Sequence, residues 1–273
     1  MIHKTIPITI GNRGNGATLT TYILENFSEI DNSRKRPAIL ICPGGSYRYI
    51  TERETEAVAI KMNSLGFHAF ILRYTVTRGA FPQSLYELAA SVKTVRDNCV
   101  NWMIDPNKII VAGFSAGGHL AASLGVFWKN HFLQAELKGN ADAWKPSGLM
   151  LGYPVLSSGR YAHSKSFRTL LGDNYDKYKE KVSLEKQVNS AVPPTFLWHT
   201  VSDAQVPVEN SLLFAQALSQ HGIPFALHIF STGRHGISLA TSETSHDKID
   251  INSEVQIWPS LFATWVNEQF NKS

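Results

Sequence analysis

The stretch KIIVAGFSAGGHLAASLG, residues 108–125, decides the fold. Its first part is a continuous apolar run, which is typical of a strand covered on both faces. Its second part combines small and apolar residues in a helical pattern. Ser115 stands where the two parts meet, between Gly113 and Gly117. The sequence therefore predicts a strand over 108–113, a sharp turn at Ser115, and a helix over 116–128.

Strand and helix patterns alternate on both sides of this stretch. Apolar runs predict further strands at residues 2–10, 17–24, 37–42, 67–74, 148–155, 195–200 and 225–230. Helical spacing of apolar residues predicts helices at 51–65, 82–103, 208–221 and 257–270. Two opening strands joined by a turn at 11–16, followed by alternation, indicate an α/β fold. We expect a mostly parallel central sheet of about eight strands flanked by helices, with antiparallel strands at the N-terminus.

One segment departs from the alternation. Residues 156–192 hold glycine, serine, tyrosine and many charges, with short helical runs only near 167–171 and 178–182. An insertion of this length between two strands often forms a small cap or lid over a substrate. A surface excursion without a role is an equally good interpretation. The whole chain, 1–273, is otherwise expected to fold as a single domain.

Composition excludes several classes of protein. The net charge is +4, with basic residues that do not cluster along the chain, so a nucleic-acid-binding protein is not expected. Cys42 and Cys99 lie in apolar segments, which favours buried free thiols in a reducing compartment. The N-terminus lacks signal-peptide features, and no apolar run reaches the ~18 residues of a membrane span. We expect a cytoplasmic protein with no membrane partner, and a homo-oligomer is left open.

Residues 113–117 read G-x-S-x-G, which suggests a nucleophilic serine. The pattern alone is weak, but here an apolar strand enters it and a small-residue helix leaves it, as a nucleophile elbow requires. Such a turn needs minimal side chains beside the serine, and the helix N-terminus places backbone N–H groups near a developing oxyanion. An ordinary strand–helix turn is the alternative. We predict Ser115 as the nucleophile.

A serine nucleophile needs a base, and the base needs an orienting acid. In this chain order the acid follows a later strand, and Asp203 comes just after the strand at 195–200. A turn or helix-capping aspartate is the alternative. His235 lies in a glycine-containing loop after the last strand and is predicted as the base. His246 is the rival, although it lies farther from a strand end.

An oxyanion hole requires two backbone donors. Ala116 follows the nucleophile and would supply one. The loop after the strand at 37–42 would supply the other, and its sequence is Pro-Gly-Gly-Ser-Tyr. Gly45 is the predicted donor, with Ser46 as the alternative. A simple Pro-Gly turn would explain the glycines but not their coincidence with this position.

Four motifs together resemble bacterial acetyl-esterase and acetylxylan-esterase-type α/β-hydrolases, which are distant relatives of the hormone-sensitive-lipase-like esterases. They are CPGGSY at 42–47, GFSAGGHLAA at 113–122, VSDAQVP at 201–207 and RHG at 234–236. The resemblance implies an α/β-hydrolase fold with Ser115, His235 and Asp203 as a catalytic triad, and no metal or organic cofactor. It also implies a small-molecule substrate, a short acyl (acetyl) ester of a sugar or xylo-oligosaccharide. The larger lipase-like group has His-Gly-Gly-Gly where this chain has Pro-Gly-Gly-Ser.

Substrate contacts and rival functions follow from the same residues. Tyr47 and Tyr49, beside the predicted oxyanion loop, could stack on a sugar ring or equally pack the loop. Prolyl-type serine peptidases share the elbow and the order of the triad, so a peptidase is a second enzyme reading. A non-catalytic ligand-binding protein on a hydrolase scaffold is a third, although no triad member is lost here.

Overall fold

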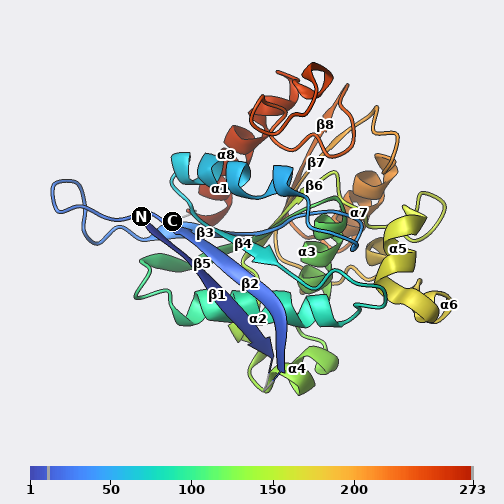
Figure 1. The fold of residues 1–273 in the computed structure, drawn as a ribbon, viewed down its shortest axis with the longest axis horizontal. Helices are drawn as coiled ribbons and strands as arrows, with labels where there is room; N and C mark the ends of the chain where they lie inside the picture. The colour runs from blue at the N-terminus through green and yellow to red at the C-terminus, as the bar shows by residue number, and fades with distance from the viewer. Residues whose placement is uncertain (11–12, 272–273) are drawn as a thin grey trace.

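One eight-stranded sheet runs through the molecule in the order β1-β2-β4-β3-β5-β6-β7-β8 (Figure 1). The structure is a computed structural model that describes residues 1–10 and 13–271. Its strands are β1 (Ile2–Ile10), β2 (Arg13–Ile23), β3 (Arg36–Cys42), β4 (His68–Arg73), β5 (Ile104–Phe114), β6 (Gly148–Gly152), β7 (Thr195–Thr200) and β8 (Phe225–Phe230). The β1–β2 and β2–β4 pairs are antiparallel and the remaining pairs are parallel. The predicted α/β fold, mostly parallel with antiparallel N-terminal strands, is confirmed.

Helices cover both faces of this sheet. They are α1 (Glu56–Ser64), α2 (Gln83–Asp97), α3 (Ser115–Phe127), α4 (His131–Leu137), α5 (Ser164–Leu171), α6 (Tyr175–Tyr178), α7 (Glu209–Gln220) and α8 (Trp258–Phe270). Buried residues of α2, α3, α4 and α7 belong to one apolar cluster, and those of α1 and α8 to the other. In Figure 1, α1 and α8 accordingly lie above the sheet, and α2 and α4 below it.

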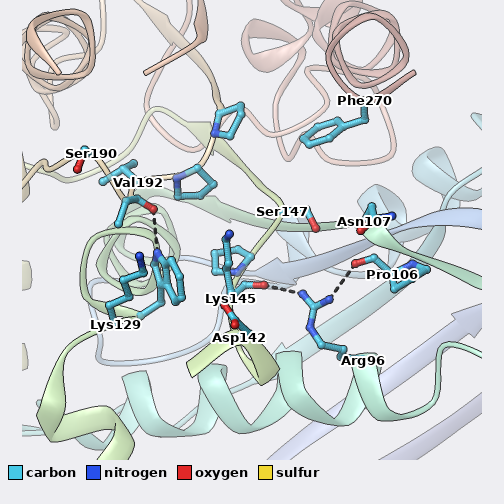
Figure 2. A pocket seen from close by; sticks show the side chains of 15 residues that line it. Arg96, Pro106, Asn107, Lys129, Asp142, Lys145, Ser147, Ser190, Val192 and Phe270 are labelled. Carbon is cyan, nitrogen blue, oxygen red and sulfur yellow. Dashed lines mark hydrogen bonds between the residues drawn. The ribbon is translucent and has the colours of Figure 1, made fainter. Parts of the chain in front are cut away.

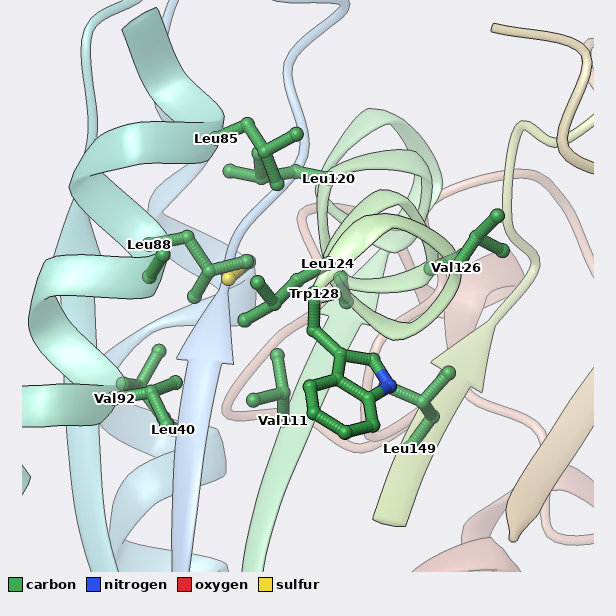
Figure 3. Packing of buried hydrophobic residues seen from close by; sticks show 14 of the residues in the cluster. Leu40, Leu85, Leu88, Val92, Val111, Leu120, Leu124, Val126, Trp128 and Leu149 are labelled. Atoms are coloured by element: carbon green, nitrogen blue, oxygen red, sulfur yellow. The ribbon is translucent and has the colours of Figure 1, made fainter. Parts of the chain in front are cut away.

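Continuously apolar strands explain this double coverage. Along β3, Leu40 points to the cluster of α2 and α3, whereas Ile39 and Ile41 point to that of α1 and α8. Successive side chains of a strand face opposite sides, so a strand buried on both faces must be apolar at every position. Figure 3 shows the larger cluster, in which Val111 and Leu149 of the sheet meet Leu124 of α3.

Element ends differ from the sequence predictions in a few places. The helix expected over 82–103 ends at Asp97, and Cys99 and Trp102 are buried in the turns that follow. The helix expected over 51–65 is a short 3-10 turn (Glu52–Glu54) followed by α1. Helix α4 was not predicted, because only one of its residues, Leu133, is fully buried. Residues 11–12 of the expected turn lie outside the described residues, and β2 already begins at Arg13.

The 156–192 segment is folded and packed against the core. It contains α5, α6 and two 3-10 turns, and the second helix comes earlier than the expected run at 178–182. Phe167, Leu170 and Leu171 of α5 are buried in the larger apolar cluster. In Figure 1, α5 and α6 lie beside α7, at the end of the molecule away from the chain termini.

Two further sequence expectations concern the cysteines and the lack of a membrane-spanning segment. Cys42 and Cys99 are both free and buried. In the part of the chain that the structure describes, every helix is too short or too polar to cross a lipid bilayer.

Candidate active site

Ser115 occupies the predicted sharp turn between β5 and α3. Its φ of 52° lies in the left-handed region, which non-glycine residues rarely adopt and which here lifts the side chain out of the strand–helix junction. Gly117 passes so close to the end of the neighbouring strand β3 that a Cβ on it would lie 2.0 Å from the Cys42 carbonyl oxygen. The glycine is therefore required by packing, as the G-x-S-x-G pattern implied.

The three residues predicted as a triad lie together. Ser115 Oγ is 2.7 Å from His235 Nε2, and His235 Nδ1 is 2.7 Å from Asp203 Oδ2. Because the carboxylate only accepts, His235 Nδ1 carries the proton and Nε2 is free to accept from the serine hydroxyl. His246, the rival base, is exposed in the loop between β8 and α8. The arrangement is that of a serine hydrolase with a polarised nucleophile.

Besides His235, other groups also hold the carboxylate of Asp203. Its Oδ1 accepts hydrogen bonds from the Gln205 and Val206 N–H groups, each at 2.9 Å. Its Oδ2 also lies 3.4 Å from Nε2 of the buried His199. Burial raises the pKa of Asp203, but the two imidazoles and the Val206 N–H more than offset this and hold it below the ordinary value. The Asp203 carboxylate is thus kept ionised and directed at His235 Nδ1. The sequence analysis did not predict the contact with His199.

The loop expected to carry an oxyanion donor adjoins Ser115. Gly45 has a φ of 123°, and a Cβ there would lie 2.0 Å from the Tyr49 carbonyl oxygen, so only glycine fits. The loop closes on itself through Arg48 N–H, which donates to the Gly45 carbonyl at 2.9 Å. Gly44 N–H donates to Glu54 instead. Gly45 and Ser46 line the pocket with Ser115, and Ala116 lies in the first turn of α3, where N–H groups lack helical acceptors.

Glu54 links this loop to the histidine, which the sequence analysis did not foresee. Its carboxylate accepts from Gly44 N–H at 2.6 Å and from the Tyr153 hydroxyl at 2.7 Å. Tyr153 in turn packs edge-on against His235, with ring centroids 5.1 Å apart. Glu54 is only 1% exposed, and burial raises its pKa although both donors act in the opposite direction. The buried Glu54 carboxylate is thereby bonded to the loop at Gly44 and to Tyr153, which packs against His235.

We expect Glu54→Gln to lower kcat by roughly tenfold or more with little change in KM, because small displacements of catalytic groups are costly. The amide nitrogen of glutamine would face either the Gly44 N–H, which cannot accept, or the Tyr153 hydroxyl, which would have to accept where it now donates. Steady-state kinetics on a p-nitrophenyl ester measure this. Glu52→Gln is the matched control, since Glu52 is an exposed neighbour that pairs with Arg73 at 2.7 Å. Equal kcat in both variants would contradict the positioning role.

The two tyrosines expected to contact substrate differ in position. Tyr47 is 1% exposed, and its hydroxyl donates to Nδ1 of the buried His119 at 2.8 Å. His119 Nε2 donates to the Val182 carbonyl at 2.9 Å, and burial lowers the pKa of this histidine to about 4. Of the two roles considered for Tyr47, the structure therefore favours packing of the loop over stacking on a sugar. Tyr49 is 60% exposed and lines the rim of the pocket.

The pocket around Ser115 is small and mostly polar. It has a volume of about 190 Å³, and Arg53 and Gln205 line it together with Ser115 and His235. A separate hollow of about 560 Å³ lies beside Trp128, Lys129 and Lys145 (Figure 2). It adjoins the N-terminal ends of β6 and β7, whereas Ser115 lies at the C-terminal end of β5, on the opposite side of the molecule along the strands. Only the small pocket contains the predicted residues.

Comparison with solved structures defines the class. An acetyl ester-xyloside bifunctional hydrolase from Caldicellulosiruptor lactoaceticus matches with a TM-score of 0.81 and 36% identity, over 98% of this chain and 96% of that one. A carboxylesterase from Lactobacillus plantarum matches with a TM-score of 0.87 and 28% identity, over 98% of each chain. The protein is an α/β hydrolase of the class to which these ester hydrolases belong.

Within that class, the chain belongs to the BD-FAE family, whose model matches residues 26–218. An endo-1,4-beta-xylanase B from Butyrivibrio fibrisolvens is 40% identical over 218 residues, which is 77% of this chain and 34% of the relative. An acetylxylan esterase from Xylanibacter ruminicola is 27% identical over 221 residues, 78% of this chain and 43% of the relative. The chain thus spans less than half the length of these two relatives. The predicted resemblance to acetylxylan-esterase-type hydrolases is confirmed.

Proposed function

We propose that this protein is a serine esterase that cleaves short acyl esters, acetyl esters of sugars or xylo-oligosaccharides foremost, through an acyl-enzyme. The observation that carries the proposal is the pair of 2.7 Å contacts that joins Ser115 to His235 and His235 to Asp203, with Ser115 and His235 lining a small pocket. Nothing in the proposed reaction calls for a metal or an organic cofactor.

Each step follows from this geometry. His235 Nε2 takes the hydroxyl proton as Ser115 Oγ attacks the ester carbonyl, and Asp203 stabilises the imidazolium that forms. The N–H groups of Gly45 and Ala116 hold the tetrahedral oxyanion, and each such donor is typically worth roughly 3 kcal/mol. His235 then gives its proton to the departing alcohol. A water molecule, deprotonated by the same nitrogen, releases the acid and restores Ser115.

Pocket size and relatives support the substrate class. A volume of about 190 Å³ lies below the usual range for ligand pockets and suits a short acyl group. Two similar proteins are named as an acetylxylan esterase and an acetyl ester-xyloside bifunctional hydrolase. Tyr49, exposed beside the pocket, offers a ring on which a sugar can stack.

Hydrolysis of a p-nitrophenyl series from acetate to decanoate tests the proposal. We expect kcat/KM to be highest for acetate and to fall by more than about tenfold by octanoate, because longer chains exceed the pocket. Acetate release from acetylated xylo-oligosaccharides tests the sugar part. A prolyl p-nitroanilide serves as the control for peptidase activity. A well-folded protein that cleaves the anilide and none of the esters would overturn the proposal.

A further inference from the structure

A second groove adjoins the active site, and we call it the basic groove. Its volume is about 590 Å³, and four cations line it: Arg48, Arg78, Lys165 and Arg168. The residues that line it include no aspartate or glutamate. These cations come from three separate segments, so the sequence alone shows no basic cluster. The fold creates a local positive field that the modest net charge of +4 does not suggest.

Two features connect the basic groove to the active site. Ser46 lines the pocket of Ser115, and the next two residues, Tyr47 and Arg48, line the groove. At the other wall, α5 begins after His163, whose pKa is lowered by burial and further by the charges of His235 and Lys165. Lys165, in the first turn of α5, itself lines the groove. The loop of residues 45–48 thus borders both the pocket of Ser115 and the groove.

The walls of the groove are fixed to one another. The Gly79 N–H donates to the Thr169 carbonyl at 2.8 Å, and the Phe81 N–H donates to the Leu170 carbonyl at 3.1 Å. Both acceptors lie in the last turn of α5, so the segment after β4 caps this helix. The cations are thus presented from a preformed scaffold, which reduces the entropy lost on binding.

The cations are only partly neutralised within the protein. Arg78 pairs with Asp173 at 2.5 Å, but both side chains are largely exposed, and such pairs contribute little. Arg168 lies over the Tyr175 ring at 4.6 Å. Among the described residues, Arg48 and Lys165 form no ion pair. Guanidinium groups beside a free ammonium favour oxyanions such as carboxylate and phosphate.

We propose that the basic groove binds a carboxylate or phosphate carried by the molecule whose ester lies at Ser115, so that the preferred substrate is an acyl ester of an acidic saccharide. This inference rests on the proposed esterase function and adds the charge of the substrate to it. The 156–192 segment then acts in specificity, because α5 supplies two of the four cations.

Three acetylated disaccharides that differ only at C6 of the unacetylated ring test this: a hydroxymethyl, a carboxylate and a phosphorylated form. At low salt we expect kcat/KM for an acidic form to exceed that for the neutral form by about tenfold. High salt should reduce the advantage, since exposed charges are screened. The carboxylate and phosphate arms identify which anion the groove prefers. Equal rates for all three forms would overturn the proposal.

The double variant Lys165→Gln/Arg168→Gln should bring the acidic-to-neutral ratio of kcat/KM close to one. The matched control is Lys129→Gln with Lys145→Gln, which removes the same charge beside the hollow at the N-terminal ends of β6 and β7. A loss of the ratio in the control as well would assign the effect to overall charge and refute the groove.

Calorimetric titration with the deacetylated disaccharides gives a readout without turnover. Binding of the acidic form in preference to the neutral one supports the groove even where no ester is hydrolysed, which would be a failure of the proposed function alone. Equal or absent binding of both disaccharides, together with turnover of the neutral ester, would refute the groove alone.

Discussion

Ser115→Ala is expected to lower kcat for p-nitrophenyl acetate by about 10⁶-fold, the scale of loss seen when a serine nucleophile is removed. The variant keeps the pocket and the proposed oxyanion donors but lacks the atom proposed to attack the carbonyl. Its stability should change by less than about 1 kcal/mol, because one small hydroxyl in contact with solvent-accessible space is removed. Initial rates and thermal unfolding of the purified variant measure both quantities.

Ser123→Ala is the matched control for this loss. Ser123 is also buried in α3, two turns beyond the nucleophile, and it does not line the active-site pocket. The same substitution there should leave kcat within about twofold of the wild-type value. Retained turnover in Ser115→Ala, or an equal loss in both variants, would remove Ser115 from the proposed mechanism.

The sequence predicted best those elements whose position is determined by the residues of the element itself. Continuous apolar runs located the central strands β3, β4, β6 and β7, because double burial requires apolar residues at every position. Helix ends were predicted less well. Apolar spacing continues through Cys99 and Trp102, although the chain leaves the helix at Asp97, since turn residues can fill a core as well. Helix α4 gave no signal because it buries little.

The candidate site follows the same distinction. Ser115 was predicted from the G-x-S-x-G motif between a strand and a helix, and Asp203 and His235 were predicted from their positions after later strands. Glu54 was missed because its partners, Gly44 and Tyr153, lie in other segments and meet it only in three dimensions. A glutamate in a segment predicted as an ordinary helix gives no sign of burial. The role of Tyr47 stayed open between packing and stacking for a related reason, since nothing in the sequence reveals its contact with His119.

Asp203→Asn is expected to lower kcat by about 10⁴-fold while the protein stays folded at pH 7. The amide would donate to His235 Nδ1 and force the ring proton onto Nε2. That nitrogen would then face the Ser115 hydroxyl as a donor and could not accept its proton. Steady-state rates measure the loss. A loss of less than tenfold would show that Asp203 does not set the tautomer.

The same substitution should also change how stability depends on pH. The folded protein holds the pKa of Asp203 below the ordinary 3.8, so at acidic pH the unfolded chain binds more protons than the folded one. This carboxylate therefore stabilises the fold at pH values above 3.8, and the contribution is lost as pH falls through the folded pKa. The difference in unfolding free energy between wild type and Asp203→Asn should thus be largest near neutral pH and shrink in acid. Denaturant titrations at several pH values measure it, and a difference that grew on acidification would mean that the hydrogen bonds from His199, His235 and the Val206 N–H do not favour the ionised form.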